Sequence, residues 1–183
     1  DWAAVLRRLR APGGCPWDRE QTHESLMPYL LEESYEVLDA VQKEDMFALA
    51  DELGDVLLQV VFHSVIAEAH EEFMLSDVTT SICQKMIRRH THIFGEDKCE
   101  TSDEVLKNWE KVKREQSGAS SVTQTLEEVP ETLTALMRAA KIQKKAASVG
   151  FDWDGAEGAI DKVLEETEEV RAAAAQNEGE ARV

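Results

Sequence analysis

Two pairs of acidic residues stand at equal distances from residue 44. Glu33 and Glu36 are three residues apart, as are Glu52 and Asp55, and residues at that spacing share one face of a helix. Residue 44 is the midpoint of Glu33 and Asp55, and it is also the midpoint of Glu36 and Glu52. A hairpin of antiparallel helices that turns there would place Glu33 beside Asp55. The same symmetry would place Glu36 beside Glu52.

The apolar pattern on both sides of this point predicts such a hairpin. We expect a helix over 25–42 with Ser25 as its N-cap, a tight turn at 43–45, and a second helix over 46–72. Pro28 would then lie in the first turn, where its missing N–H costs nothing. Both acid pairs would border the apolar stripes through which the two helices pack.

Carboxylates that converge at such a seam repel each other unless a cation or protons intervene. Ligands that offer only oxygen favour Mg²⁺ or Mn²⁺ over zinc or copper. Gly54 costs about 1 kcal/mol in a helix relative to alanine, which close approach of the partner helix or of a ligand would explain. The alternative is a solvated acidic face, the usual state of a single pair of helical glutamates. The symmetry of two pairs favours a divalent metal site.

The charge balance limits which partners the chain can have. It has 37 acidic and 20 basic residues, a formal charge of −17, whereas a nucleic-acid binder normally carries a basic stripe. We therefore expect no nucleic-acid partner. No uncharged run approaches the ~18 residues that a membrane span needs, so we expect no membrane partner either. Three cysteines without CxxC spacing are typical of reduced thiols in a cytoplasmic protein.

An anionic substrate of so acidic a chain must be met by a metal or by a local basic cluster. Lys85 and Arg89 are four residues apart and share a helical face, from which they could neutralise phosphate oxygens. Trp109 and Lys113 repeat the spacing, so that the indole could stack on a nucleobase while the lysine reaches phosphate or base edge. The alternative is that the cations solvate an exposed face and that the tryptophan is a core residue.

The rest of the chain is predicted to be helical, with a partial internal repeat. Leu31–Val37 reappears at 164–170 and Gly14–Asp18 has an echo at 150–154, at offsets of 133 and 136 residues. Agreement in order and offset suggests a tandem module whose second copy is incomplete. We therefore predict a module over 1–115, a linker over 116–125 and the first part of a second module over 126–183.

Shorter elements follow from local signals. A turn without regular structure is expected at 12–18, where two prolines and two glycines fall in five residues. Capping residues and periodicity predict helices in the remaining segments, at 1–11, about 76–89, about 101–114, 126–148 and 156–175.

Together these residues resemble a known family. Glu32-Glu33-x-x-Glu36, followed after 15 residues by Glu52-x-x-Asp55, resembles the EExxE…ExxD signature of the all-α nucleotide pyrophosphohydrolases. Several further segments resemble the MazG branch of that superfamily, namely 14–23, 28–33, 88–94 and 109–113. Residues 141–144 and 150–153 resemble the beginning of the second MazG module.

The resemblance implies an all-α fold, a MazG-like four-helix module in a dimeric helical bundle, followed by the start of a similar module. It implies a Mg²⁺-dependent hydrolase, with Mn²⁺ as a possible substitute, that converts a nucleoside triphosphate and water to the monophosphate and pyrophosphate. The roles that it implies are metal ligands at Glu33, Glu36, Glu52 and Asp55, and substrate contacts at Lys85, Arg89, Trp109 and Lys113. Glu32 would be either the base or a residue that supports the metal ligands. Two alternatives stay open: a narrower dUTP- or dCTP-preferring enzyme, and a nucleotide-binding or structural helical dimer with a degenerate site.

Overall fold

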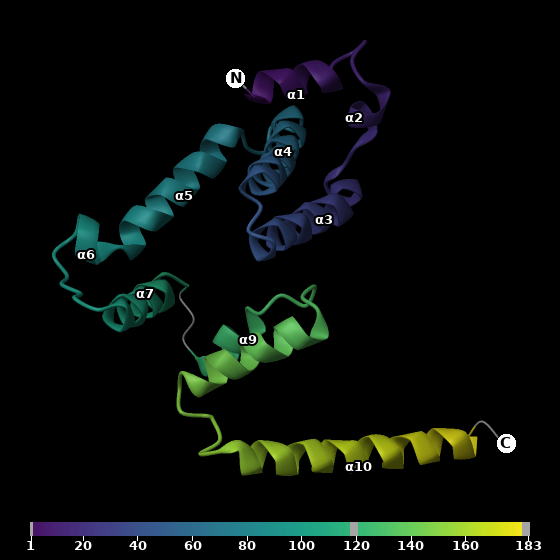
Figure 1. The fold of residues 1–183 in the computed structure, drawn as a ribbon, viewed down its shortest axis with the longest axis vertical. Coiled ribbons are helices and arrows are strands. Elements are labelled where there is room, and N and C mark those ends of the chain that lie inside the picture. The colour runs from purple at the N-terminus through teal and green to yellow at the C-terminus, as the bar shows by residue number, and fades with distance from the viewer. Residues whose placement is uncertain (1, 118–120, 181–183) are drawn as a thin grey trace. The chain divides into compact units, whose positions relative to one another are not determined.

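The computed structural model describes residues 2–117 and 121–180, and every regular element in these ranges is a helix (Figure 1). The predicted all-α class is confirmed. The chain divides into two compact units, Asp1–Trp109 and Glu110–Val183. The predicted module boundaries stay a prediction, and residues 118–120 of the predicted linker lie outside the described residues. None of the described helices combines the length and apolar composition that crossing a bilayer requires.

The predicted hairpin is present in the first unit. Helix α3 (His23–Gln42) packs along α4 (Met46–Ala69), and the connection is the predicted turn at 43–45. Glu44 has a left-handed backbone, with φ of 55°, which reverses the chain between the two helices. Asp45 is the N-cap of α4, because its Oδ1 accepts hydrogen bonds from two backbone amides of the first turn, at 3.1 and 3.0 Å.

The beginning of α3 differs from the prediction. Thr22, not Ser25, is the N-cap, and the two residues form a reciprocal capping box. The Thr22 hydroxyl accepts from the Ser25 amide at 3.2 Å, and the Ser25 hydroxyl accepts from the Thr22 amide at 2.9 Å. Pro28 therefore lies inside the helix, where it removes a backbone hydrogen bond. Burial of Leu26 one turn from the cap helps to offset that loss.

The segment before α3 contains a short helix that the sequence did not predict. Helix α1 (Trp2–Arg10) is followed by a tight turn and then by α2 (Pro16–Glu20). Proline at the first position of a helix costs nothing, so the expectation that 16–18 lacks regular structure was wrong. The turn itself is confirmed: a Cβ at Gly14 would lie 2.2 Å from the Leu9 carbonyl oxygen, so only glycine fits there.

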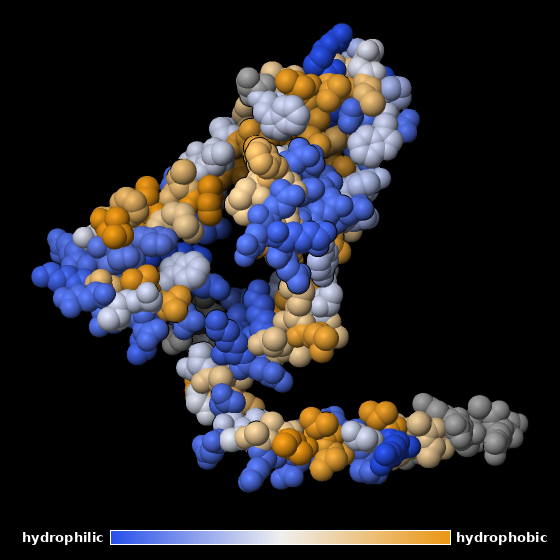
Figure 2. Space-filling view, viewed as in Figure 1, coloured by the Kyte–Doolittle hydropathy of each residue, from blue (hydrophilic) through white to orange (hydrophobic). Residues whose placement is uncertain are grey.

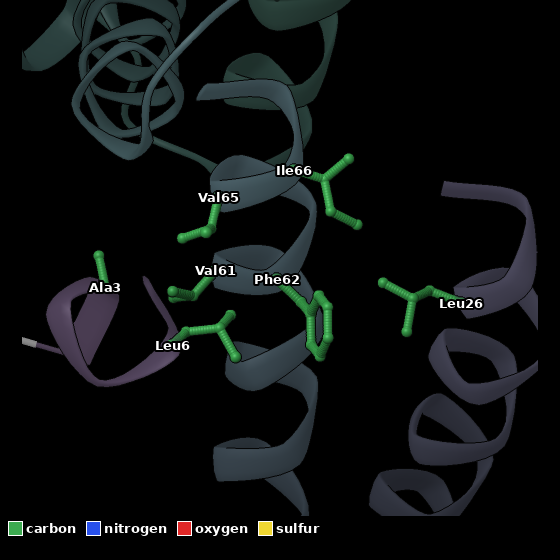
Figure 3. Close-up of a cluster of buried hydrophobic side chains, with 7 residues drawn as sticks. All are labelled: Ala3, Leu6, Leu26, Val61, Phe62, Val65 and Ile66. Carbon is green, nitrogen blue, oxygen red and sulfur yellow. The ribbon is translucent and has the colours of Figure 1, made fainter. Parts of the chain in front are cut away.

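Three helices of the first unit meet in one apolar core. Figure 3 shows Leu6 of α1 directed toward Val61, and Leu26 of α3 directed toward Phe62 and Ile66 of α4. Leu6 and Leu26 are each 1% exposed, and burying a leucine contributes about 1.5–3 kcal/mol to folding. Arg10 ties α1 to the start of α3, because its guanidinium donates to the Gln21 carbonyl at 3.1 Å. The core therefore fixes the start of α3 against the second half of α4.

The first unit continues through helices α5 (Leu75–Arg89) and α6 (Thr91–Phe94) and ends within α7 (Ser102–Ser117), at Trp109. We expected Ser76 or Asp77 to cap α5, which was wrong: Met74 is the N-cap, and Asp77, inside the first turn, accepts from the Met74 amide at 2.8 Å. The predicted capping box of α7 is confirmed. Thr101 Oγ1 accepts from the Glu104 amide at 3.3 Å, and Glu104 Oε2 accepts from the Thr101 amide at 3.4 Å.

The second unit contains helices α8 (Val122–Glu127), α9 (Ala135–Ala147) and α10 (Ala156–Glu180). The predicted helix over 126–148 is interrupted, because the segment around Pro130 is irregular and proline cannot continue a helix. Lys145 holds α9 against α8 through the Thr125 carbonyl and, at 3.7 Å, through Glu128. Apolar side chains along α10 are exposed (Figure 2), among them Ile160, Val163, Leu164 and Val170.

Candidate metal centre

Three of the predicted ligands converge between α3 and α4. One carboxylate oxygen of each lies within 4.8 Å of the others, and these residues, Glu33, Glu36 and Glu52, are called the acid triplet below. Two oxygens on opposite sides of a Mg²⁺ ion are about 4.2 Å apart, given bonds of 2.0–2.1 Å. The oxygens of the triplet, which lie within 4.8 Å of one another, would thus have to draw together to hold one such ion. Oxygen donors alone are the ligand set that Mg²⁺ and Mn²⁺ prefer.

Asp55 lies outside the triplet but acts on it. Partial burial raises the pKa of Glu33, and the hydrogen bond with Glu36 and the negative charges of Asp55, Glu36 and Glu52 raise it further. The pKa of Glu52 is also raised, first by partial burial and then by nearby charges, among which are those of Glu36 and Asp55. The charges of Glu36 and Asp55 thus both oppose the ionisation of Glu33 and Glu52.

The local sequence explains why the four acids meet. The capped turn of three residues brings the two helices back on each other at once, and the apolar core holds the far ends of the hairpin together. No other described part of the chain approaches Gly54. A Cβ there would meet no heavy atom within 4 Å, so the predicted close approach of the partner helix is wrong, and close approach of a ligand stays a prediction.

Glu32, the predicted base, is exposed on α3 and is not part of the acid triplet. It lies four residues before Glu36 and therefore near the same helical face. Its role as the base stays a prediction.

Gln59 is a buried polar residue of α4 that the sequence did not single out. It is 5% exposed, and its Oε1 has no hydrogen-bond partner among the described residues. Leaving a buried carbonyl oxygen unpaired costs about 1–3 kcal/mol. Its spacing of four residues from Asp55 is the signal that could have revealed it, because that spacing places both on one face of α4.

A histidine pair, also missed, joins the same two helices. His23 at the start of α3 and His63 in α4 form a side-chain hydrogen bond of 2.7 Å between their Nδ1 atoms. Burial lowers the pKa of His63, and the neighbouring His23 lowers it further. No spacing in the sequence links His23 to His63, and only the folded hairpin brings them together.

The predicted substrate-binding residues lie on α5 and α7. The Arg89 guanidinium lies over the Trp109 indole, 5.9 Å from the ring centroid, so the structure brings these two together. Lys85 lies one turn before Arg89, and Lys113 one turn after Trp109. None of the four belongs to the acid triplet, and their substrate roles stay a prediction.

Comparison with known proteins places the acids inside a defined domain. Residues 21–94 match the MazG nucleotide pyrophosphohydrolase domain, a segment that includes the four acids, Lys85 and Arg89 but ends before Trp109. The chain is similar to proteins from three bacteria. It is 47% identical over 167 residues to the nucleoside triphosphate pyrophosphohydrolase of Escherichia coli (strain K12), across 91% of this chain and 64% of the relative.

The second relative is the nucleoside triphosphate pyrophosphohydrolase/pyrophosphatase MazG of Thermotoga maritima. The identity is 42% over 170 residues, across 93% of this chain and 65% of the relative. The third is the nucleoside triphosphate pyrophosphohydrolase of Mycolicibacterium smegmatis, with 38% identity over 153 residues, across 82% of this chain and 46% of the relative. The chain thus spans less than two thirds of the length of each of these relatives.

Proposed function

Since this chain belongs to the MazG family, we propose that it is a Mg²⁺-dependent hydrolase that converts a nucleoside triphosphate and water to the nucleoside monophosphate and pyrophosphate. The observation that supports this most directly is the convergence of the acid triplet within 4.8 Å. The names of the relatives supply the reaction class, and the oxygen-only donor set supplies the choice of metal. Mn²⁺ fits the same donors.

In this proposal Glu33, Glu36, Glu52 and Asp55 hold the cation. Partial burial and mutual repulsion make the four acids costly to ionise together, so a divalent cation stabilises them in the ionised form. When bound, Mg²⁺ offsets charge on the phosphates and lowers the pKa of a coordinated water. The protein contributes the fixed spacing of the ligands through the hairpin.

Glu32 is the proposed general base. Its carboxylate accepts a proton from the attacking water, whose oxygen forms a bond to the α-phosphorus. The bond between the α-phosphorus and the bridging oxygen breaks in line with the attack, and pyrophosphate leaves. Because Glu32 lies outside the acid triplet, it can take the proton without giving up a ligand position.

The substrate contacts in this proposal are Lys85, Arg89, Trp109 and Lys113. The guanidinium covers one face of the indole, and 36% of Trp109 is exposed, so a nucleobase would stack on the other face. A guanidinium in that position also neutralises phosphate oxygens. A narrower preference for dUTP or dCTP would require a base-edge contact in addition to this stacking.

We also propose that two copies of the chain associate through the outer face of the hairpin. The predicted apolar stripes are only partly covered within one chain: Val61 is 1% exposed, whereas Leu38 and Leu57 are 61% and 53% exposed. A helical hairpin buries one side of each helix, and a second copy would bury the other. Leu38→Glu should shift the chain to a monomer in light scattering after gel filtration, while Asp39→Ala, its exposed neighbour, should not.

The decisive experiment is a pyrophosphate-release assay with a panel of ribo- and deoxyribonucleoside triphosphates, with and without Mg²⁺. Metal-dependent release of stoichiometric pyrophosphate and monophosphate is expected. Metal-dependent binding of triphosphate without release would instead favour the second candidate, a nucleotide-binding helical dimer with a degenerate site. Release of orthophosphate in place of pyrophosphate would overturn the proposed reaction.

A further inference from the structure

Gln59 is a polar side chain buried in the half of α4 that forms the apolar core. Its Oε1 has no hydrogen-bond partner among the described residues, although Phe62 and Ile66, one and two turns further along the helix, belong to the apolar cluster. A methionine has the same length and would leave no acceptor unpaired there. Buried polar atoms are nearly always paired, and an exception points to a donor that an ion, a water or a ligand brings.

The position of Gln59 indicates where the donor to its Oε1 comes from. Asp55 precedes it by four residues on the same helical face, and His63, four residues later, bonds to His23 of α3. This face of α4 therefore meets α3, as the acid triplet does. Because Cα–Cβ bonds in a helix tilt toward its N-terminus, the Gln59 side chain extends toward the turn that holds Asp55 and Glu52.

The chemistry of the neighbours limits what can donate to Gln59. Ionised carboxylates only accept hydrogen bonds, so the acids themselves cannot satisfy Oε1. A water bound to a divalent cation is a donor, and Mg²⁺ keeps several of its waters in protein sites. A neutral amide also adds no charge to a seam that already holds four acids, whereas a glutamate at this position would add a fifth.

We propose that Gln59 is a positioning residue of the metal centre: its Oε1 accepts a hydrogen bond from a water carried by the cation that the four acids hold. The inference rests on the metal centre proposed above and names a residue outside the ligand set. Outer-shell partners of this kind orient what the metal carries, and their loss typically lowers metal affinity 10–100-fold.

The test is Mn²⁺ binding to the full chain, measured by calorimetry and by the relaxation enhancement of water protons around the bound ion. The variant is Gln59→Met, and the matched control is Gln42→Met at the exposed end of α3. We expect Gln59→Met to weaken Mn²⁺ binding about 10–100-fold and to change the relaxation enhancement. Without metal, its thermal midpoint should equal or exceed that of the wild type, because a buried unpaired acceptor is gone.

The outcomes separate the two proposals. If the wild type binds Mn²⁺ and Gln59→Met binds it equally well with the same relaxation enhancement, the role of Gln59 is overturned and the metal centre stands. If Gln59→Met unfolds at a lower temperature without metal, the amide is a structural residue and the inference is likewise overturned. If the wild type shows no saturable Mn²⁺ binding, both proposals fail. Gln42→Met should match the wild type throughout.

Discussion

The Nδ1 atoms of His23 and His63 are 2.7 Å apart, although 40 residues separate them in the sequence. The rings are nearly parallel, at 5°, and their centres are 5.0 Å apart. The distance between the ring centres is about equal to the Nδ1–Nδ1 distance plus the distance from each ring centre to its own Nδ1. The two rings therefore lie end to end and do not overlap face to face. One imidazole must donate and the other accept, and the pair therefore requires at least one neutral histidine.

Acid should weaken the fold through this pair. The folded pKa of His63 is lowered by burial and by His23, so near pH 6 the unfolded chain binds more protons and stability rises with pH. This contribution is complete above the ordinary pKa of about 6.5 and is lost as pH falls through the lower value of the folded protein. Urea unfolding between pH 5 and 8 should show that slope in the wild type.

In His63→Gln the slope should diminish, because the titrating group is gone while an amide can still bond to His23. The control is His70→Gln, at the exposed C-terminal end of α4, which should keep the slope of the wild type. If the free energy of unfolding changed with pH in the same way in the wild type and in His63→Gln, His63 would not be the source of the slope.

Removing one carboxylate of the metal centre should abolish activity without lowering the stability of the metal-free chain. Glu36→Gln deletes a charge that opposes the ionisation of Glu33 and Glu52, so the metal-free chain should unfold at an equal or higher temperature. Asp55→Asn should behave similarly. Both variants should lose the rise in thermal midpoint on adding Mn²⁺ and should lose metal-dependent pyrophosphate release, with an unchanged helical circular dichroism spectrum.

Asp39→Ala is the matched control for these two variants, because Asp39 is exposed on α3 and pairs with Lys43 at the turn. It should retain both the response to Mn²⁺ and the turnover. Wild-type turnover in Glu36→Gln or Asp55→Asn would remove that residue from the proposed ligand set.

Arg89 should contribute to substrate affinity more than to the chemical step. Arg89→Gln removes a cation whose charge-assisted hydrogen bonds are worth about 1.5–3 kcal/mol, which corresponds to a rise in KM of roughly 10–100-fold with a smaller change in kcat. Arg88→Gln, next to it on an exposed part of α5, should change KM little. Equal losses in both variants would indicate general electrostatics instead of a specific contact.

The docking of α1 should depend on one leucine. Leu6 is 1% exposed within the core cluster, so Leu6→Ala should lower the free energy of unfolding by about 2–5 kcal/mol. Leu9→Ala removes a partly exposed leucine from the same helix and should cost less than about 1 kcal/mol. Similar losses in calorimetric or urea unfolding would show that α1 is not held by the observed contacts.

The hairpin was predictable because its information is local and periodic. The acids, the apolar stripes and the turn at 43–45 all specify one geometry, and the structure brings Glu33, Glu36 and Glu52 together as expected. Helix ends were harder to place, because Thr22 and Ser25 are both good caps and only their reciprocal hydrogen bonds decide which one begins α3. Proline likewise both ends helices and begins them, as it does at Pro16.

Gln59 and the histidine pair could not be found by the same reasoning. A glutamine or histidine within an apolar run has no periodicity of its own, and its meaning depends on what the other helix places opposite. The position of Arg89 over Trp109 depends in the same way on how α5 and α7 approach each other. Pairings between elements far apart in sequence are set by tertiary packing, which spacing along the chain does not encode.

The connection between α3 and α4 has only three residues, and this leaves the hairpin no tolerance for insertion. One added residue would rotate every later side chain of α4 by about 100° and would move Glu52 and Asp55 away from their partners. Substitutions in this loop can be absorbed, since its own side chains do not hold the cation in our proposal. A change in its length would separate the four acids, so the number of residues in the loop matters as much to the proposed metal centre as the carboxylates themselves.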